Sequence, residues 1–119
     1  MSEQLRPPGK TTIAPDVLVS IARLTTLGVQ GVSRLAPVPG DVNRLFNKGI
    51  TDGVKIIVED NTVYADLYVV LKHNFNVRDV SRNIQTQVTR AIAEMVGMDV
   101  GKVNVHVEEI DFAEEGSAQ

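Results

Sequence analysis

The sequence predicts an α+β domain, a two-layer sandwich in which two helices pack on one face of a small sheet of three or four strands. Three observations support this fold class. Apolar residues alternate through two consecutive segments, 54–59 and 62–72, as expected of two strands joined by a short turn. Apolar residues then recur at helical spacing over 77–95, and a Val-rich alternating segment follows at 102–110.

The chain of 119 residues is long enough for one domain with one core, which we place at residues 10–112. Residues 1–9 contain a Pro-Pro-Gly sequence that cannot enter regular structure, so we expect a flexible N-terminal arm. Residues 113–119 form an acidic tail that we expect to be disordered. Aromatic residues are only 4% of the chain, so the core must be aliphatic.

The first helix is predicted to begin at Pro15, because proline suits a first helical position, where its missing N–H is not needed. Asp16 places a negative charge at the positive end of the helix dipole. The apolar stripe of this helix is formed by Leu18, Ile21, Ala22 and Thr25, flanked by Val17 and Leu24. Gly28 is expected to end the helix. Before the helix, residues 10–14 have the composition of a short strand.

Residues 29–35 are expected to form a brief strand, and residues 36–52, which are rich in turn-forming residues, a mobile segment. The hairpin that follows turns at Asp60 and Asn61, since both residue types tolerate positive φ. On the returning strand, the inward side chains are predicted to be Val63, Ala65, Leu67, Val69 and Leu71. The opposite face then carries Tyr64, Asp66, Tyr68, Val70 and Lys72.

The second helix is expected to start after Asn76, whose side chain can cap the first turn, with Asp79 at the third helical position. Its apolar stripe consists of Val77, Val80, Ile84, Val88, Ala91, Ile92 and Met95. Gly97 is expected to end it. The last strand, at 102–110, is predicted to bury Val103, Val105 and Val107 and to expose Asn104, His106 and Glu108.

Composition excludes several classes of function. The chain has no cysteine, which rules out disulfides, thiolate nucleophiles and cysteine zinc sites and fits a cytoplasmic protein. A net charge of −3 argues against a general nucleic-acid binder. The N-terminus shows no signal peptide, and no apolar run approaches the ~18–20 residues needed to span a bilayer, so any membrane role should be indirect.

Several segments together carry a family resemblance. They are YADLYVVLKHNFNV at 64–77, a helix of the pattern VxxxIQxxVxxAIxEMVGM at 80–98, and VxKVNVHVEEI at 100–110. With TIAPDVLVSIARLTTLGVQGVSRL at 12–35, they resemble the bacterial alkaline-shock and glucose-starvation protein family, also called envelope stress response proteins. The resemblance extends over residues 12–110, although residues 40–53 are short and poor in the Gly and Lys that many relatives carry there.

The resemblance implies a non-enzymatic cytoplasmic protein of cell-envelope stress and homeostasis. It also implies self-association and a membrane-anchored protein partner that holds the protein near the membrane. The family is not defined by a catalytic signature, so the resemblance transfers no catalytic, cofactor-binding or metal-binding residue, and we expect no cofactor. The residues agree, since they contain no nucleophile–base pair, no H-E-x-x-H motif and no phosphate-binding glycine loop.

The face of the sheet opposite the helices is the main candidate site. Ile57, Tyr64, Tyr68 and Val70 make it more apolar than a solvated face requires, and His106 should lie on the same side. Contiguous exposed apolar surface usually marks an interface, so these residues form a candidate protein–protein interface. The alternative is that the middle segment or the N-terminal arm covers this face.

Two further patterns each have a functional and a structural explanation. Arg78, Arg82 and Arg90 form a basic stripe on the second helix, suited to an acidic partner or anionic headgroups, or simply to a solvated helix surface. Gly28 and Gly31 match the G-x-x-G pattern with which KH domains clamp nucleic acid, so a small KH-like nucleic-acid-binding module is the alternative function. However, that loop contains no Lys or Arg, and a helix stop followed by a turn explains both glycines.

Three side chains of types that can bind metal ions are expected near the end of the sheet. His106 and Glu108 are two residues apart and so share a strand face, and His73 follows the preceding strand. Two histidines and a carboxylate can hold a metal ion, but no further ligand is evident and such side chains are more often solvated. We therefore expect no metal site.

Overall fold

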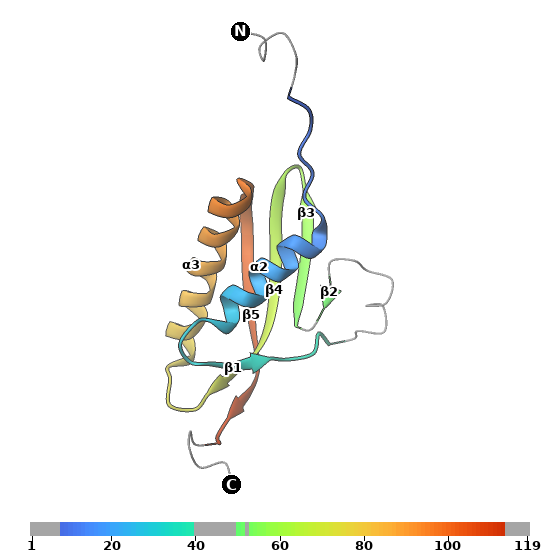
Figure 1. Ribbon diagram of the computed structural model, residues 1–119. Coiled ribbons are helices and arrows are strands. Elements are labelled where there is room, and N and C mark those ends of the chain that lie inside the picture. The colour runs from blue at the N-terminus through green and yellow to red at the C-terminus, as the bar shows by residue number, and fades with distance from the viewer. Residues whose placement is uncertain (1–7, 40–49, 52, 114–119) are drawn as a thin grey trace.

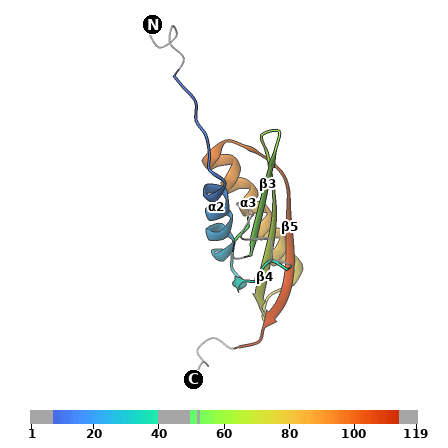
Figure 2. The ribbon, with the colours of Figure 1, turned by 90° about the vertical axis from the view of Figure 1, so that its right-hand side faces the viewer.

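A computed structural model describes residues 8–39, 50–51 and 53–113 and shows two layers (Figure 1). The helices α2 (Pro15–Leu27) and α3 (Val77–Val96) make one layer. The other layer is a sheet formed by β1 (Val32–Leu35), β2 (Ile50–Thr51), β3 (Val54–Glu59), β4 (Thr62–Lys72) and β5 (Asp99–Asp111). Both helices lie on the same side of the sheet (Figure 2), so the predicted α+β sandwich is confirmed.

The central strand of the sheet is β4. The parallel strand β5 pairs with it from Thr62 to Lys72 and so takes one whole edge. The antiparallel strands β3 and β1 share the other edge, since β3 pairs with Thr62–Leu67 and β1 with Val69–Leu71. Strand β2 extends the sheet beyond β3. The sheet is therefore mixed, and its two short strands bring the total to five instead of the expected three or four.

The predicted turn and caps form as local chemistry requires. Asp60 and Asn61 have φ of 52° and 60°, the positive values that a tight two-residue hairpin turn demands. The side chain of Asn76 accepts a hydrogen bond from the backbone N–H of Asp79 at 3.0 Å and caps α3. Gly97 ends α3 with a left-handed φ of 71°. These predictions are confirmed.

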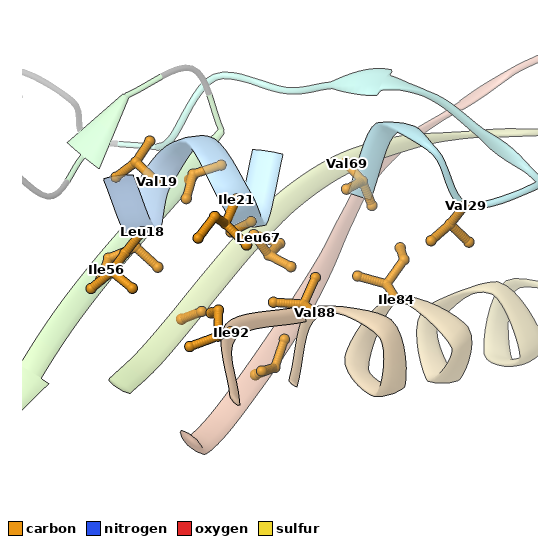
Figure 3. Close-up of a cluster of buried hydrophobic side chains, with 14 of the residues drawn as sticks. Leu18, Val19, Ile21, Val29, Ile56, Leu67, Val69, Ile84, Val88 and Ile92 are labelled. Carbon is orange, nitrogen blue, oxygen red and sulfur yellow. The ribbon is translucent and has the colours of Figure 1, made fainter. Parts of the chain in front are cut away.

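Aliphatic side chains fill the space between the layers. Figure 3 shows how the two helices meet the sheet through Leu18, Val19 and Ile21 of α2, Ile84, Val88 and Ile92 of α3, Ile56 of β3, and Leu67 and Val69 of β4. Each of these side chains is at most 8% exposed. Burying one of them contributes about 1.5–3 kcal/mol relative to leaving it in water. This shared core holds both helices on one face of the sheet.

Two details of the predicted elements are wrong. Residues 10–14 form no strand, because pairing rather than composition stabilises a strand and no described strand lies beside them. Val77 and Met95, assigned to the apolar stripe of α3, are 43% and 70% exposed. Val77 lies in the first turn of the helix, before the first buried residue, Val80, and Met95 lines a shallow hollow beside Val17 and Leu24 of α2.

The segments predicted to be flexible lie largely outside the described residues. Of the arm at 1–9, only residues 8 and 9 are described, and of the tail at 113–119, only Ala113. In the middle segment, the structure does not describe residues 40–49 and 52. Ala36 and Val38, which precede them, are buried, with exposed fractions of 5% and 6%. The flexibility of these segments therefore stays a prediction.

Candidate protein-interaction face

The side of the sheet that faces away from the helices is not covered by any other described part of the chain (Figure 2). We define the outer face by the side chains that β3, β4 and β5 present there: Lys55, Ile57, Tyr64, Asp66, Tyr68, Lys102, Asn104 and His106, together with Glu108, whose carboxylate lies near Tyr68. Tyr64 lies beside Ile57 of β3, and Tyr68 lies beside His106 of β5. The structure thus brings four of the predicted interface residues together on this face.

Tyr68, His106 and Asp66 form a connected cluster at the centre of the outer face. The rings of Tyr68 and His106 stack, with centroids 4.4 Å apart and planes inclined by 13°. Asp66 Oδ1 lies 2.9 Å from His106 Nε2 and accepts a hydrogen bond from Asn104 Nδ2 at 3.1 Å. Because an ionised carboxylate only accepts hydrogen bonds, His106 Nε2 is the donor in its contact. The cluster orders the tyrosine ring on a surface where it would otherwise keep its rotamer freedom.

The electrostatic surroundings of Tyr68 are negative. Partial burial raises the pKa of the Tyr68 hydroxyl above its ordinary value, and the carboxylates of Asp66 and Glu108 raise it further. The burial contribution disfavours any charge beside the ring, whereas the two carboxylates add a local negative potential that disfavours phosphate groups. Because Lys55 and Lys102 lie elsewhere on the outer face, this negative potential is local to the Tyr68 hydroxyl.

Tyr64 is positioned by a β-bulge in β5. The register against β4 shifts between Val100, which lies opposite Val63, and Lys102, which lies opposite Tyr64. Gly101 is the extra residue, and a Cβ atom added there would clash with the ring of Tyr64, which therefore lies directly against the glycine backbone. Bulges at sheet edges redirect side chains in this way. Our sequence predictions missed Gly101, although a glycine inside a Val-rich strand signals a bulge or a close approach.

Val70 adds no exposed apolar surface to the outer face, contrary to the prediction from strand alternation, because it is only 2% exposed. In the register of the sheet it lies between Arg34 of β1 and Glu109 of β5. Arg34 Nη2 and Glu109 Oε1 form an ion pair at 3.7 Å. Since side chains paired across neighbouring strands point to the same side, the Arg34 side chain reaches over Val70 and covers it. The sequence did not reveal that β1 pairs at this position.

A second bulge brings Ser33 and Arg34 to one carboxylate at this end of the face. The register of β1 against β4 shifts at Ser33. Ser33 Oγ donates a hydrogen bond to Asp111 Oδ2 at 2.7 Å, and Arg34 Nη1 lies 3.6 Å from the same oxygen. The Ser33 hydrogen bond, the backbone N–H of Ala113 and the charges of Arg34 and His73 lower the pKa of the Asp111 carboxyl. The sequence predictions missed this group because Ser33 and Asp111 are 78 residues apart.

The arginines of the predicted basic stripe are all exposed on α3. At 3.6 residues per turn, Arg82 lies about 40° and Arg90 about 120° round the helix from Arg78. Arg78 and Arg90 line two separate shallow hollows that have no residue in common. The charges are therefore spread round the helix, as on an ordinary solvated face, instead of forming one narrow stripe.

The G-x-x-G pattern has a packing explanation. Gly28 ends α2, and Gly31 has a φ of 101° in the turn that leads to β1. A Cβ atom at Gly31 would lie 2.7 Å from Val80 Cγ2 and 3.0 Å from Phe75 Cγ, so the turn passes tightly against the start of α3. A buried glycine cannot meet a nucleic-acid backbone as a KH loop does. The nucleic-acid alternative thereby loses the feature that suggested it.

The three potential metal ligands do not come together. His106 contacts Tyr68 and Asp66, whereas the ring of His73 packs against Phe112 with centroids 5.7 Å apart. Within the described part of the chain, no three His, Cys, Asp or Glu side chains are grouped so that they could hold a metal ion. The helices described here also include none with the length and apolar character required to cross a membrane.

Comparison with known sequences bears out the family resemblance. The sequence model of the alkaline-shock protein family, described as having a cell envelope-related function, matches residues 3–112. Uncharacterized protein Spy1535 of Streptococcus pyogenes serotype M6 is 38% identical over 104 residues, which cover 86% of this chain and 79% of that protein. Uncharacterized protein YqhY of Bacillus subtilis strain 168 is 26% identical over 106 residues, which cover 87% of this chain and 78% of that protein.

Solved structures provide a second comparison. The MamM CTD in its copper form superimposes with a TM-score of 0.55 at 10% sequence identity, covering 84% of this chain and 90% of that chain. Another MamM CTD structure has a TM-score of 0.50 at 13% identity, covering 79% of this chain and 95% of that chain. At such low identity the likeness shows a shared fold and nothing about function.

Proposed function

Because this chain belongs to the alkaline-shock protein family, whose function is cell envelope-related, we propose that it is a non-enzymatic interaction protein of envelope homeostasis and stress response. It works in the cytoplasm, self-associates, and comes close to the membrane through a membrane-anchored protein partner that binds the outer face. The observation that carries this proposal is the outer face itself, which no helix covers (Figure 2) and on which the rings of Tyr68 and His106 stack.

The chemistry of the outer face supports a protein partner. Aromatic residues are enriched at protein interfaces, and tyrosine provides a large contact area with few rotatable bonds. Tyr64 and Tyr68 are partly exposed, and Ile57 beside them is 44% exposed. The negative surroundings of Tyr68 favour basic residues on the partner.

The non-enzymatic part of the proposal is supported by the way in which the reactive side chains are engaged. His106 is hydrogen-bonded to Asp66 and stacked on Tyr68, and the hydroxyl of Ser33 donates to Asp111. Activation of a serine requires a neighbouring base that accepts its proton, usually an imidazole. Neither contact pairs a serine hydroxyl with an imidazole.

The proposal is tested by capturing membrane proteins on the immobilised full-length chain. The wild type is compared with Tyr64→Lys/Tyr68→Lys and with a control, Thr86→Lys/Thr89→Lys, which adds the same charge on the exposed side of α3. We expect wild type and control to retain the same membrane protein and the tyrosine variant to lose it by at least about tenfold, because buried interface tyrosines are often dominant. Circular dichroism verifies that all three proteins are folded. Equal retention by the three proteins, or no specific retention by the wild type, would contradict the proposal.

A further inference from the structure

The edge of β5 that faces away from β4 is a second unpaired surface of the sheet. Among the described residues, β5 pairs with β4 and with no other strand. An edge strand presents a row of backbone N–H and C=O groups that can pair with another strand. The carbonyl of Val103 accepts a hydrogen bond from the side-chain amide of Gln85 of α3 at 3.1 Å, so this carbonyl points away from β4, and a second strand would share or replace that bond.

The middle of β5 is regular enough to pair. Its register against β4 shifts at Gly101 and again at Glu108, but the segment from Lys102 to Val107 pairs without interruption with Tyr64–Val69. That segment has the length of an ordinary strand, about 5–6 residues. The two bulges therefore mark the ends of the stretch available for pairing and limit the number of possible registers.

We propose that β5 pairs antiparallel with β5 of a second copy of this chain, about a two-fold axis that passes through Val105. The inference rests on the self-association proposed above and names its interface. In a two-fold interface the same surface of both copies is used, so the strand must be complementary to itself when its direction is reversed.

The side chains of β5 meet this requirement. On the outer side, Lys102 comes opposite Glu108, the bulge residue that ends the regular segment in the second copy; both are exposed, and the Glu108 carboxylate lies near Tyr68. On the inner side, Val103 comes opposite Val107 of the second copy, and Val105 comes opposite Val105 of the second copy. Opposite charges and apolar pairs stabilise neighbouring strands, whereas like charges destabilise them. An axis one residue earlier, through Asn104, would place Lys102 opposite His106 and lose the ion pair.

This arrangement leaves the outer face free for its partner. A two-fold axis perpendicular to the sheet keeps the outer faces of both copies on one side, so the two sheets join into a continuous one. The Tyr64 and Tyr68 side chains of both copies then lie on a single extended surface. Self-association uses the β5 backbone with Lys102 and Glu108 at the border of the outer face, whereas partner binding is centred on Tyr64 and Tyr68, so separate variants test the two.

The test is a charge-reversal cycle on the full-length chain, measured by light scattering and by sedimentation over a range of concentrations. Lys102→Glu and Glu108→Lys each place like charges opposite one another, and each should raise the dissociation constant of the dimer at least about fivefold. The double variant Lys102→Glu/Glu108→Lys restores opposite charges and should recover the wild-type mass. Lys55→Glu changes the charge of the outer face on β3, away from this edge, and should keep the wild-type mass.

Three outcomes would overturn the pairing of β5. The first is that Lys102→Glu and Glu108→Lys keep the wild-type dissociation constant. The second is that the double variant remains dissociated. The third is that Tyr64→Lys/Tyr68→Lys loses the dimer while Lys102→Glu keeps it, which would show that the two copies meet through their outer faces. A wild type that is monomeric at every concentration would remove self-association altogether, while capture of a membrane protein by the outer face could still succeed.

Discussion

The two faces of β4 are built from alternate residues of one strand, yet they are held in different ways. The inward side chains of Val63, Leu67 and Val69 are fully buried among other aliphatic groups. The outward rings of Tyr64 and Tyr68 remain partly exposed and are held by a bulge glycine and by a stacked, hydrogen-bonded histidine. Apolar cores tolerate changes that conserve volume, whereas a polar cluster depends on each of its partners. The inner face therefore provides stability, and the outer face provides a specific surface.

The largest effect on stability is expected on the inner face. Leu67→Ala removes a side chain that is 0% exposed and leaves a cavity, so the free energy of unfolding should fall by about 2–5 kcal/mol. Urea unfolding followed by circular dichroism measures the loss. Tyr68→Ala on the adjacent outward position should cost clearly less, because part of its ring already faces water. Equal losses at both positions would remove the distinction between the faces.

A smaller loss is expected where the outer face depends on close contact. Gly101→Ala places a methyl group against the ring of Tyr64, and overpacking of this kind costs about 1–3 kcal/mol. In a Tyr64→Ala background the same change should cost much less, since the ring is gone. A double-mutant cycle measures this coupling. Additive losses would show that the bulge does not hold Tyr64.

A gain in stability is expected at the one polar side chain in the inner layer of α2. Thr26 is 0% exposed, and its Oγ1 has no hydrogen-bond partner among the described residues. Thr26→Val keeps the shape and removes the unsatisfied oxygen, so the free energy of unfolding should rise by about 1 kcal/mol. The exposed control Thr86→Val should change it little. A loss at Thr26 would indicate that the hydroxyl has a partner after all.

The smallest effect on stability is expected at Asp111, near the end of β5, and it depends on pH. The Ser33 hydrogen bond, first among several causes, lowers the pKa of Asp111 in the folded state. The resulting stabilisation is fully present above the unfolded-state pKa and is lost as the pH falls through the folded-state pKa. Asp111→Asn should therefore lower the melting temperature at neutral pH, and the difference from wild type should vanish in acid. In a Ser33→Ala background, the change in melting temperature caused by Asp111→Asn should be smaller. A change that persists unchanged into acid would contradict this account.

Much of the fold follows from short-range chemistry and could be predicted. The hairpin turn at Asp60 and Asn61 follows from tolerance of positive φ, and the start of α3 follows from the capping side chain of Asn76. The period of two along β4 assigns Leu67 to the core and Tyr68 to the outer face. Local sequence patterns alone thus predict most of the elements, the aliphatic core and most of the candidate interface.

Which strands are neighbours, and in what register, could be learned only from the folded molecule. Pairing of β1 with β4 buried Val70 beneath Arg34, and the bulges of β1 and β5 joined Ser33 to Asp111 and placed Tyr64 on Gly101. The period of a strand says which side each residue faces, but it carries no information about the strand alongside. That choice depends on long-range packing of the whole sheet against its helices, in which contributions from distant parts of the chain are added together.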